Sequence, residues 1–142
     1  MKKILIPIDG TERSLQSLDF VKNTFPKDSV EITLMNVKEL VFTRTAILFD
    51  VEEIRNFKNI GNNKLEKIKR RLEEYKVDTY FTFGYPGEEI IEKSKEGKYD
   101  VIVMTKSTKK NFIDSIGSVT VHVVKKAKCT VIIVPEYNKK YN

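Results

Sequence analysis

The run Val101-Ile102-Val103-Met104 constrains the fold of this chain more than any other stretch. Consecutive apolar residues, most of them β-branched, are typical of a strand buried on both faces of a parallel sheet. A polar loop with small hydroxyl residues and lysines follows, and Gly117-Ser118-Val119 then opens an expected helix. Strand, loop and helix start in this order offer free backbone N–H groups and a positive helix end, which suit an anion. In open α/β sheets such a loop lies beyond the carboxyl ends of the strands, where ligands bind.

Shorter apolar runs alternate with helical patterns along the rest of the chain. Thr11 or Ser14 can cap the first helix, and Gly97 is expected to end a later one. A long helix expected over about 51–75 contains Gly61-Asn62-Asn63, which predicts an interruption there. Alternating strands and helices imply βαβ units with right-handed crossovers and a central parallel sheet in one α/β domain. We expect the strands at 3–8, 30–37, 77–83, 101–104 and 130–134.

Length and composition fit one globular domain. The chain has 142 residues, 40% of them hydrophobic and 32% charged, which is enough for a proper core. Its apolar runs are too short to span a bilayer, and the amino terminus lacks the pattern of a signal peptide. The single cysteine, Cys129, cannot form an intrachain disulfide. These features predict a cytoplasmic protein.

The net charge of +6 is open to two interpretations. A basic domain can bind nucleic acid, so a nucleic-acid-associated protein is one alternative. The 26 Lys and Arg residues, however, are mixed with 20 Asp and Glu residues along the chain. We therefore favour a solvated surface, and expect neither nucleic acid nor a membrane as partner.

Five segments carry a resemblance to a known family. They read ILIPIDG at residues 4–10, GYPGEEI at 84–90, YDVIVM at 99–104, GSV at 117–119 and CTVIIVP at 129–135. In identity, order and spacing they resemble the universal stress protein family over nearly the whole chain. The resemblance implies a Rossmann-like open parallel sheet of five strands in the order 3-2-1-4-5, with helices on both faces. The domain would span residues 1–137, with 138–142 as a disordered tail.

The resemblance also implies a nucleotide crevice for ATP or AMP between the ends of strands one and four. For Asp9, a turn or helix cap is an equally good interpretation, and for Pro7 and Val37 we favour simple packing. Gly117 and Ser118 also fit an ordinary helix cap. The residues matching the family's crevice are Pro7, Asp9, Val37, Met104, Thr105, Thr108, Gly117, Ser118 and Val119.

One departure from the family pattern affects the phosphate loop. ATP-binding members carry Gly-x-x-Gly, nine residues and then Gly-Ser or Gly-Thr. Here Thr105 and Thr108 replace the two glycines, and the loop is one residue shorter. Threonine adds side-chain bulk and disfavours positive φ, whereas Lys106, Lys109 and Lys110 still attract phosphate as point charges.

Loss of shape outweighs the retained charge, because a phosphate cradle depends on converging backbone N–H groups. We therefore predict a regulatory or stress-response module with a degenerate nucleotide crevice that does not bind ATP tightly. The alternative is an ATP- or AMP-binding switch with slow hydrolysis or none.

The sequence gives little support for catalysis or for a metal site. His122 is the only histidine and fits a surface or partly packed helix position, and Ser118 lacks a base partner. One histidine and one cysteine cannot form a standard structural zinc site. No Gly-x-x-x-x-Gly-Lys-Ser/Thr motif occurs. We expect neither catalytic residues nor metal ligands.

Two further segments point to contacts with partners. The last strand would lie at a sheet edge, where a bare apolar strand is an aggregation hazard unless it is covered. Pairing with the same strand of a second copy closes under two-fold symmetry, as the family resemblance implies, while the carboxyl-terminal tail is the alternative cover. Residues 38–50 lack a clear period and fit a lid, a partner surface or a frayed helix start. The strand that would form the homodimer contains Thr130, Val131, Ile132, Ile133 and Val134.

Overall fold

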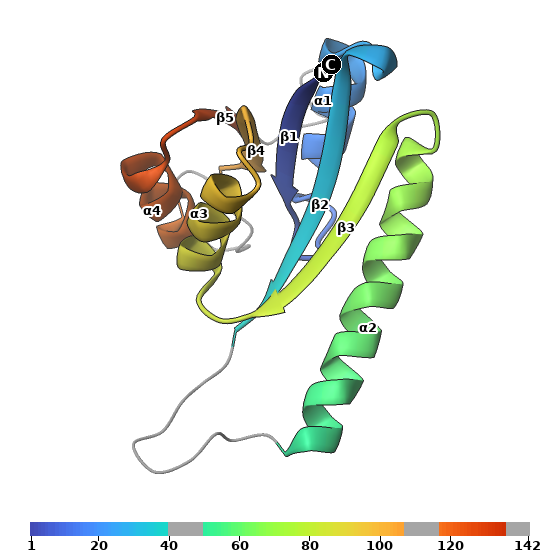
Figure 1. Cartoon of the computed structure of the whole chain (residues 1–142), viewed down its shortest axis with the longest axis vertical. Helices are drawn as coiled ribbons and strands as arrows, with labels where there is room; N and C mark the ends of the chain where they lie inside the picture. The colour runs from blue at the N-terminus through green and yellow to red at the C-terminus, as the bar shows by residue number, and fades with distance from the viewer. Residues whose placement is uncertain (40–49, 107–116, 136–142) are drawn as a thin grey trace, which may run out of the picture.

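A computed structural model describes residues 1–39, 50–106 and 117–135 of the chain. Strands and helices alternate along it (Figure 1). In chain order they are β1 (Lys2–Pro7), α1 (Gln16–Thr24), η1 (Lys27–Ser29), β2 (Val30–Lys38), α2 (Val51–Lys69), η2 (Arg70–Leu72), β3 (Lys76–Phe83), α3 (Pro86–Glu96), β4 (Val101–Thr105), α4 (Ser118–Lys126) and β5 (Thr130–Val134).

The strands form one parallel sheet in the order β3-β2-β1-β4-β5, which confirms the expected fold class. Helices α1 and α2 cover one face of the sheet, and α3 and α4 cover the other (Figure 1). The expected strands agree with the observed ones to within one residue at each end.

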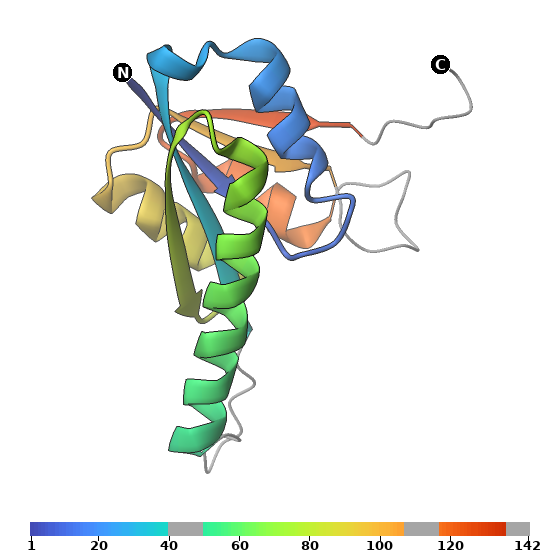
Figure 2. The ribbon, with the colours of Figure 1, turned by 90° about the vertical axis from the view of Figure 1, so that its right-hand side faces the viewer.

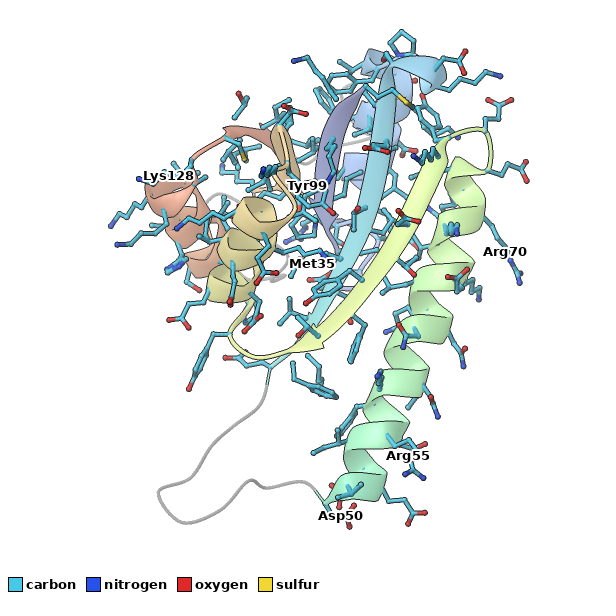
Figure 3. All side chains as sticks on the ribbon, viewed as in Figure 1. Met35, Asp50, Arg55, Arg70, Tyr99 and Lys128 are labelled. Atoms are coloured by element: carbon cyan, nitrogen blue, oxygen red, sulfur yellow. The ribbon has the colours of Figure 1, made fainter. Side chains whose placement is uncertain are left out.

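The central strand β1 is buried on both faces, which explains its continuous apolar sequence. Ile4 and Ile6 belong to the core beneath α1 and α2, and Leu5 between them belongs to the core beneath α3 and α4. Side chains of a strand alternate between its faces, so a strand covered on both sides needs apolar residues at every position. Figure 3 shows Met35 and Tyr99 lying between the sheet and α3.

Tyr99 links α3 to the sheet through a buried hydrogen bond. Its hydroxyl donates to Oγ1 of Thr33 over 2.7 Å. Burial raises the pKa of the Tyr99 phenol, so it stays protonated and able to donate at neutral pH. The ring of Tyr99 is thereby fixed in place beside the end of α3.

Helix α2 is continuous, so the interruption predicted at Gly61-Asn62-Asn63 is wrong. Gly61 faces the sheet, and a Cβ atom built on it would lie 2.1 Å from Cε2 of Phe81 in β3. The glycine therefore makes room for an aromatic ring rather than breaking the helix. The helix does end earlier than expected, at Lys69, and passes into η2.

The first helix starts later than its sequence suggests. Thr11 and Ser14 both precede α1, and neither caps it with a side chain. Instead, the Thr11 hydroxyl accepts a hydrogen bond from the Ser14 N–H over 3.2 Å, which stabilises the turn between β1 and α1. Pro26 follows the helix, as expected for a helix end.

Helix α2 is longer than the strands that it covers and runs past their carboxyl ends (Figure 2). Its outer side carries charged residues, and Figure 3 shows Arg55 and Arg70 pointing away from the sheet. Among the helices of the described ranges, none combines the length and the apolar character needed to cross a membrane.

Candidate functional site

The strand order creates a switch point between β1 and β4. From β1 the chain proceeds to β2 and β3 on one side, and from β4 it proceeds to β5 on the other. The connections therefore diverge at the carboxyl ends of these two strands, which is where open α/β sheets place their ligands. The candidate site is built around this point from the loop after β1, the end of β2, the end of β4 and the start of α4.

Asp9 shapes the loop that follows β1. Its Oδ1 accepts hydrogen bonds from the Thr11 N–H over 2.9 Å and from the Thr11 hydroxyl over 2.7 Å. This is the turn-forming role that the sequence already suggested, and it holds the exposed carboxylate at the mouth of the crevice.

Gly10 adopts a positive φ of +86° in the same loop. Lys64 reaches it from α2, because a Cβ atom on Gly10 would lie 3.0 Å from Cδ of Lys64. Both the backbone angle and this close approach favour glycine here. They also place α2 beside the loop, which the sequence alone did not indicate.

Asn36 joins the ends of β1 and β2. Its Nδ2 donates to the carbonyl of Ile8 over 2.8 Å, and the Ile8 N–H donates to the carbonyl of Met35, also over 2.8 Å. The backbone just before Asp9 is thus held against β2. The sequence analysis did not identify Asn36 as a residue that joins these strand ends.

Three of the expected crevice residues are apolar and meet in one cluster. Met104 is a buried member of the core beneath α3 and α4, and Val37 and Val119 pack against that core. Pro7, also expected in the crevice, ends β1 and pairs in register with Met35. Met104, Val37 and Val119 thus pack between the sheet and helices α3 and α4.

Thr105 is the last residue of β4, and its side chain is only 5% exposed. It lies in extended backbone on the sheet face shared by Val101 and Val103. The next residue, Lys106, donates its N–H to the carbonyl of Val134 over 3.2 Å and so continues the pairing with β5.

Gly117 is the N-cap of α4, and no side chain of the described residues caps this helix. The Gly117 N–H is not available to a ligand, because it donates to the carbonyl of Lys106 over 3.1 Å. The next N–H groups, those of Ser118 and Val119, lie in the first turn and have no acceptor within the helix. The helix start can therefore receive an anion through these two donors.

Thr120 is a second residue that the sequence did not reveal. Its hydroxyl lies 3.2 Å from the carbonyl oxygens of both Thr105 and Lys106, and its side chain is 3% exposed. The only signal was a threonine between two valines of α4. Thr108 and most of the loop around it lie outside the described residues, as do residues 40–49 and the tail after Pro135.

Two other side chains with reactive groups, those of His122 and Cys129, lie in the described part of the chain. His122 packs against α3, since a Cβ on Gly87 would lie 2.9 Å from its Cδ2. Burial raises the pKa of the Cys129 thiol, which keeps it protonated and weakly reactive at neutral pH. Within residues 1–39, 50–106 and 117–135, no three His, Cys, Asp or Glu side chains gather in a way that could hold a metal ion.

These features define a single open parallel α/β domain with its switch point between β1 and β4. Comparison with known proteins gives the family: the model of the universal stress protein family matches residues 1–135, and the chain belongs to that family. The universal stress protein MJ0531 of Methanocaldococcus jannaschii is 32% identical over 145 residues, covering 98% of this chain and 85% of that protein. MJ0577 of the same organism is 31% identical over 156 residues and covers 96% of both chains.

Solved structures agree with this fold. The structure of MJ0577 superposes with a TM-score of 0.76 at 30% identity, covering 97% of this chain and 98% of that one. An Arabidopsis thaliana family member with AMP bound superposes with a TM-score of 0.74 at 15% identity, covering 100% of this chain and 96% of that one. A member from Archaeoglobus fulgidus in complex with dAMP gives a TM-score of 0.63 at 19% identity, covering 94% of this chain and 97% of that one.

Proposed function

We propose that this protein is a regulatory module of the stress response whose crevice binds an adenine nucleotide, and a monophosphate better than ATP. The start of α4 at the switch point carries the proposal. This helix of nine residues begins at Ser118, directly after its N-cap Gly117, and no described side chain caps it. The free N–H groups and the positive end of such a helix stabilise a phosphate group.

Further features support adenine as the base. Val37 and Val119, which are partly exposed beside the buried Met104, offer an apolar surface on which a flat base can lie. Asp9 holds a carboxylate at the end of β1, where it can accept a hydrogen bond from a ribose hydroxyl. The relatives with bound AMP and dAMP share the fold, which makes these nucleotides the first ligands to test.

The preference against ATP follows from the loop after β4. Thr105 occupies the position of the first family glycine and lies buried in extended backbone, so the chain lacks a glycine's conformational freedom where a longer phosphate chain would approach. Thr108 replaces the second glycine in the same way. Lys106 attracts phosphate without fixing its geometry, because an ammonium group is a point charge on a flexible stem. A single phosphate needs only the start of α4, whereas a triphosphate also needs this loop.

Isothermal titration calorimetry with AMP and with Mg-ATP tests the proposal. We expect AMP to bind with a Kd in the micromolar range and ATP to bind at least about threefold more weakly. Gly117→Val should lower the affinity for AMP by about tenfold or more, because it places a branched side chain at the phosphate position. Asn63→Ala, on the exposed side of α2, is the matched control and should bind like the wild type.

Two results would contradict this proposal. If neither nucleotide gives a binding isotherm at concentrations of about 1 mM, the crevice is not a nucleotide site. If ATP binds more tightly than AMP and Gly117→Val abolishes this binding, the monophosphate preference is wrong. The protein would then fit the ATP-binding switch.

We also propose that the protein forms a homodimer through β5. Within the described residues β5 pairs only with β4 and lies at the edge of the sheet. Helix α4, which packs in the same core as β5, exposes 37% of Val121 and 55% of Val124. A second copy that pairs with β5 about a two-fold axis would cover the strand edge.

The domain limits of 1–137 and the cytoplasmic location are further proposals. Limited proteolysis can test the domain limits, and cell fractionation can test the location.

A further inference from the structure

The first turn of α4 is fastened to the end of β4 by Thr120. Its hydroxyl lies 3.2 Å from the carbonyl oxygen of Thr105 and 3.2 Å from that of Lys106. A hydroxyl has one proton, so the two carbonyls share it. The Gly117 N–H adds a third contact to the carbonyl of Lys106, over 3.1 Å. The helix start is thus fixed to the strand end by hydrogen bonds that bypass residues 107–116.

We propose that Thr120 is the positioning residue for the phosphate of the bound nucleotide. The inference rests on the proposed function and adds a residue outside the expected crevice set. With α4 fixed to β4, the N–H groups of Ser118 and Val119 have a defined place relative to the end of the strand. The geometry of these donors is therefore independent of the length of the loop before them, including its missing residue.

The Thr120 hydroxyl also reduces the repulsion between two backbone carbonyl oxygens and a bound phosphate. Carbonyl oxygens carry partial negative charge and repel a phosphate that lies close to them. The carbonyls of Thr105 and Lys106 follow directly on the strand that borders the crevice, and Thr120 engages both of them from the α4 side. Their partial charges are thus paired with a donor, while the N–H groups of α4 remain for the ligand.

Packing alone does not account for a threonine at this position. Thr120 is 3% exposed, and the apolar residues of this helix are all valines: Val119, Val121, Val123 and Val124. Valine has nearly the same shape as threonine and would fill the same space without donating a hydrogen bond. The hydroxyl, rather than the volume, distinguishes Thr120 from its neighbours.

Calorimetry with AMP and with adenosine, which lacks the phosphate, tests the role of Thr120. Thr120→Val should weaken AMP binding by about three- to tenfold and leave adenosine binding unchanged, because it removes the hydroxyl that orients the phosphate donors. Thr120→Ser keeps the hydroxyl and should bind AMP within about twofold of the wild type. Thr79→Val is the matched control, since the Thr79 hydroxyl donates to Oε1 of Glu66 over 3.2 Å, away from the crevice.

The inference is overturned if Thr120→Val binds AMP as the wild type does, or if it loses adenosine affinity by the same factor as AMP affinity. A Thr120→Ser variant that behaves like Thr120→Val would also overturn it. If Thr120→Val does not fold, Thr120→Ala takes its place in the comparison with Thr120→Ser. The wild type is titrated first: absence of AMP binding there refutes the proposed function and this inference together, whereas wild-type binding with an unaffected variant refutes the inference alone.

Discussion

At the end of α3, the residue with a positive φ is a lysine and not the glycine that precedes it. Gly97 is the C-cap, but its φ is −81°, which any residue can adopt. Lys98 follows with a φ of +52°, in the left-handed region that favours glycine. Gly97 is needed for space instead, because a Cβ on it would lie 2.2 Å from Cε2 of Tyr99. The sequence correctly predicted that the helix ends here, but not the reason for the glycine.

Substitutions at Lys98 and Gly97 should therefore change the free energy of unfolding in opposite directions. We expect Lys98→Gly to raise the free energy of unfolding by about 0.5–1 kcal/mol, because glycine takes a positive φ without steric cost. Gly97→Ala should lower it by about 1–3 kcal/mol, because the Tyr99 ring is held by Thr33 and cannot move aside. Urea unfolding of both variants measures the two changes. If both variants were more stable than the wild type, or both less stable, this account would be contradicted.

At the scale of the elements, α2 packs closely against β3 at Gly61. Phe81, which fills the space beside this glycine, also packs edge-on against Phe83, with ring centroids 5.2 Å apart. A larger residue at position 61 must displace a ring that already has an aromatic neighbour. The close approach of helix and strand thus depends on the pair Gly61 and Phe81.

Gly61→Ala should destabilise the protein although alanine is the better helix former. The gain in helix propensity is about 1 kcal/mol, whereas the clash at 2.1 Å with Phe81 requires repacking that costs about 1–3 kcal/mol. Chemical unfolding should also show coupling with Phe81→Leu: the alanine should cost less in the Phe81→Leu background. Asn63→Ala, exposed on the same helix, is the control and should be neutral or slightly stabilising. A more stable Gly61→Ala protein would contradict the packing argument.

Elements whose signals are local were predictable, and those that depend on distant partners were not. The apolar runs of β1, β4 and β5 are signals of buried strands that need no knowledge of the rest of the chain. The continuity of α2 depends on Phe81, which is 20 residues away in sequence, and no local pattern announces that contact. The start of α1 was misplaced although its contacts are local, because the hydrogen bond between Thr11 and Ser14 belongs to the turn before the helix.

At the scale of the whole molecule, the site residues that end strands could be predicted, because parallel strands bring their carboxyl ends to one edge. Asp9 was placed near that edge because it follows an apolar strand, and Val37 and Met104 were placed there by the family resemblance. Asn36 and Thr120 could not be found in this way, since their functions are hydrogen bonds to backbone carbonyls of other elements. Such contacts require the register between strands and the position of α4, which only the folded molecule defines.

The assembly of two copies provides the last prediction. We expect light scattering to show a wild-type dimer at concentrations of about 10–100 µM. Val124→Lys and Ile132→Lys should each raise the Kd for dimer dissociation by about 100-fold or more, because each would bury an unpaired charge at the interface. Val124 is 55% exposed in the single chain, so its substitution should leave the monomer folded. Ile60→Lys is the matched control: Ile60 is 56% exposed on α2, far from β5, and its variant should remain dimeric. A monomeric wild type, or a Val124→Lys protein as dimeric as Ile60→Lys, would show that the β5 edge is covered in another way, for which the tail after Pro135 is the alternative.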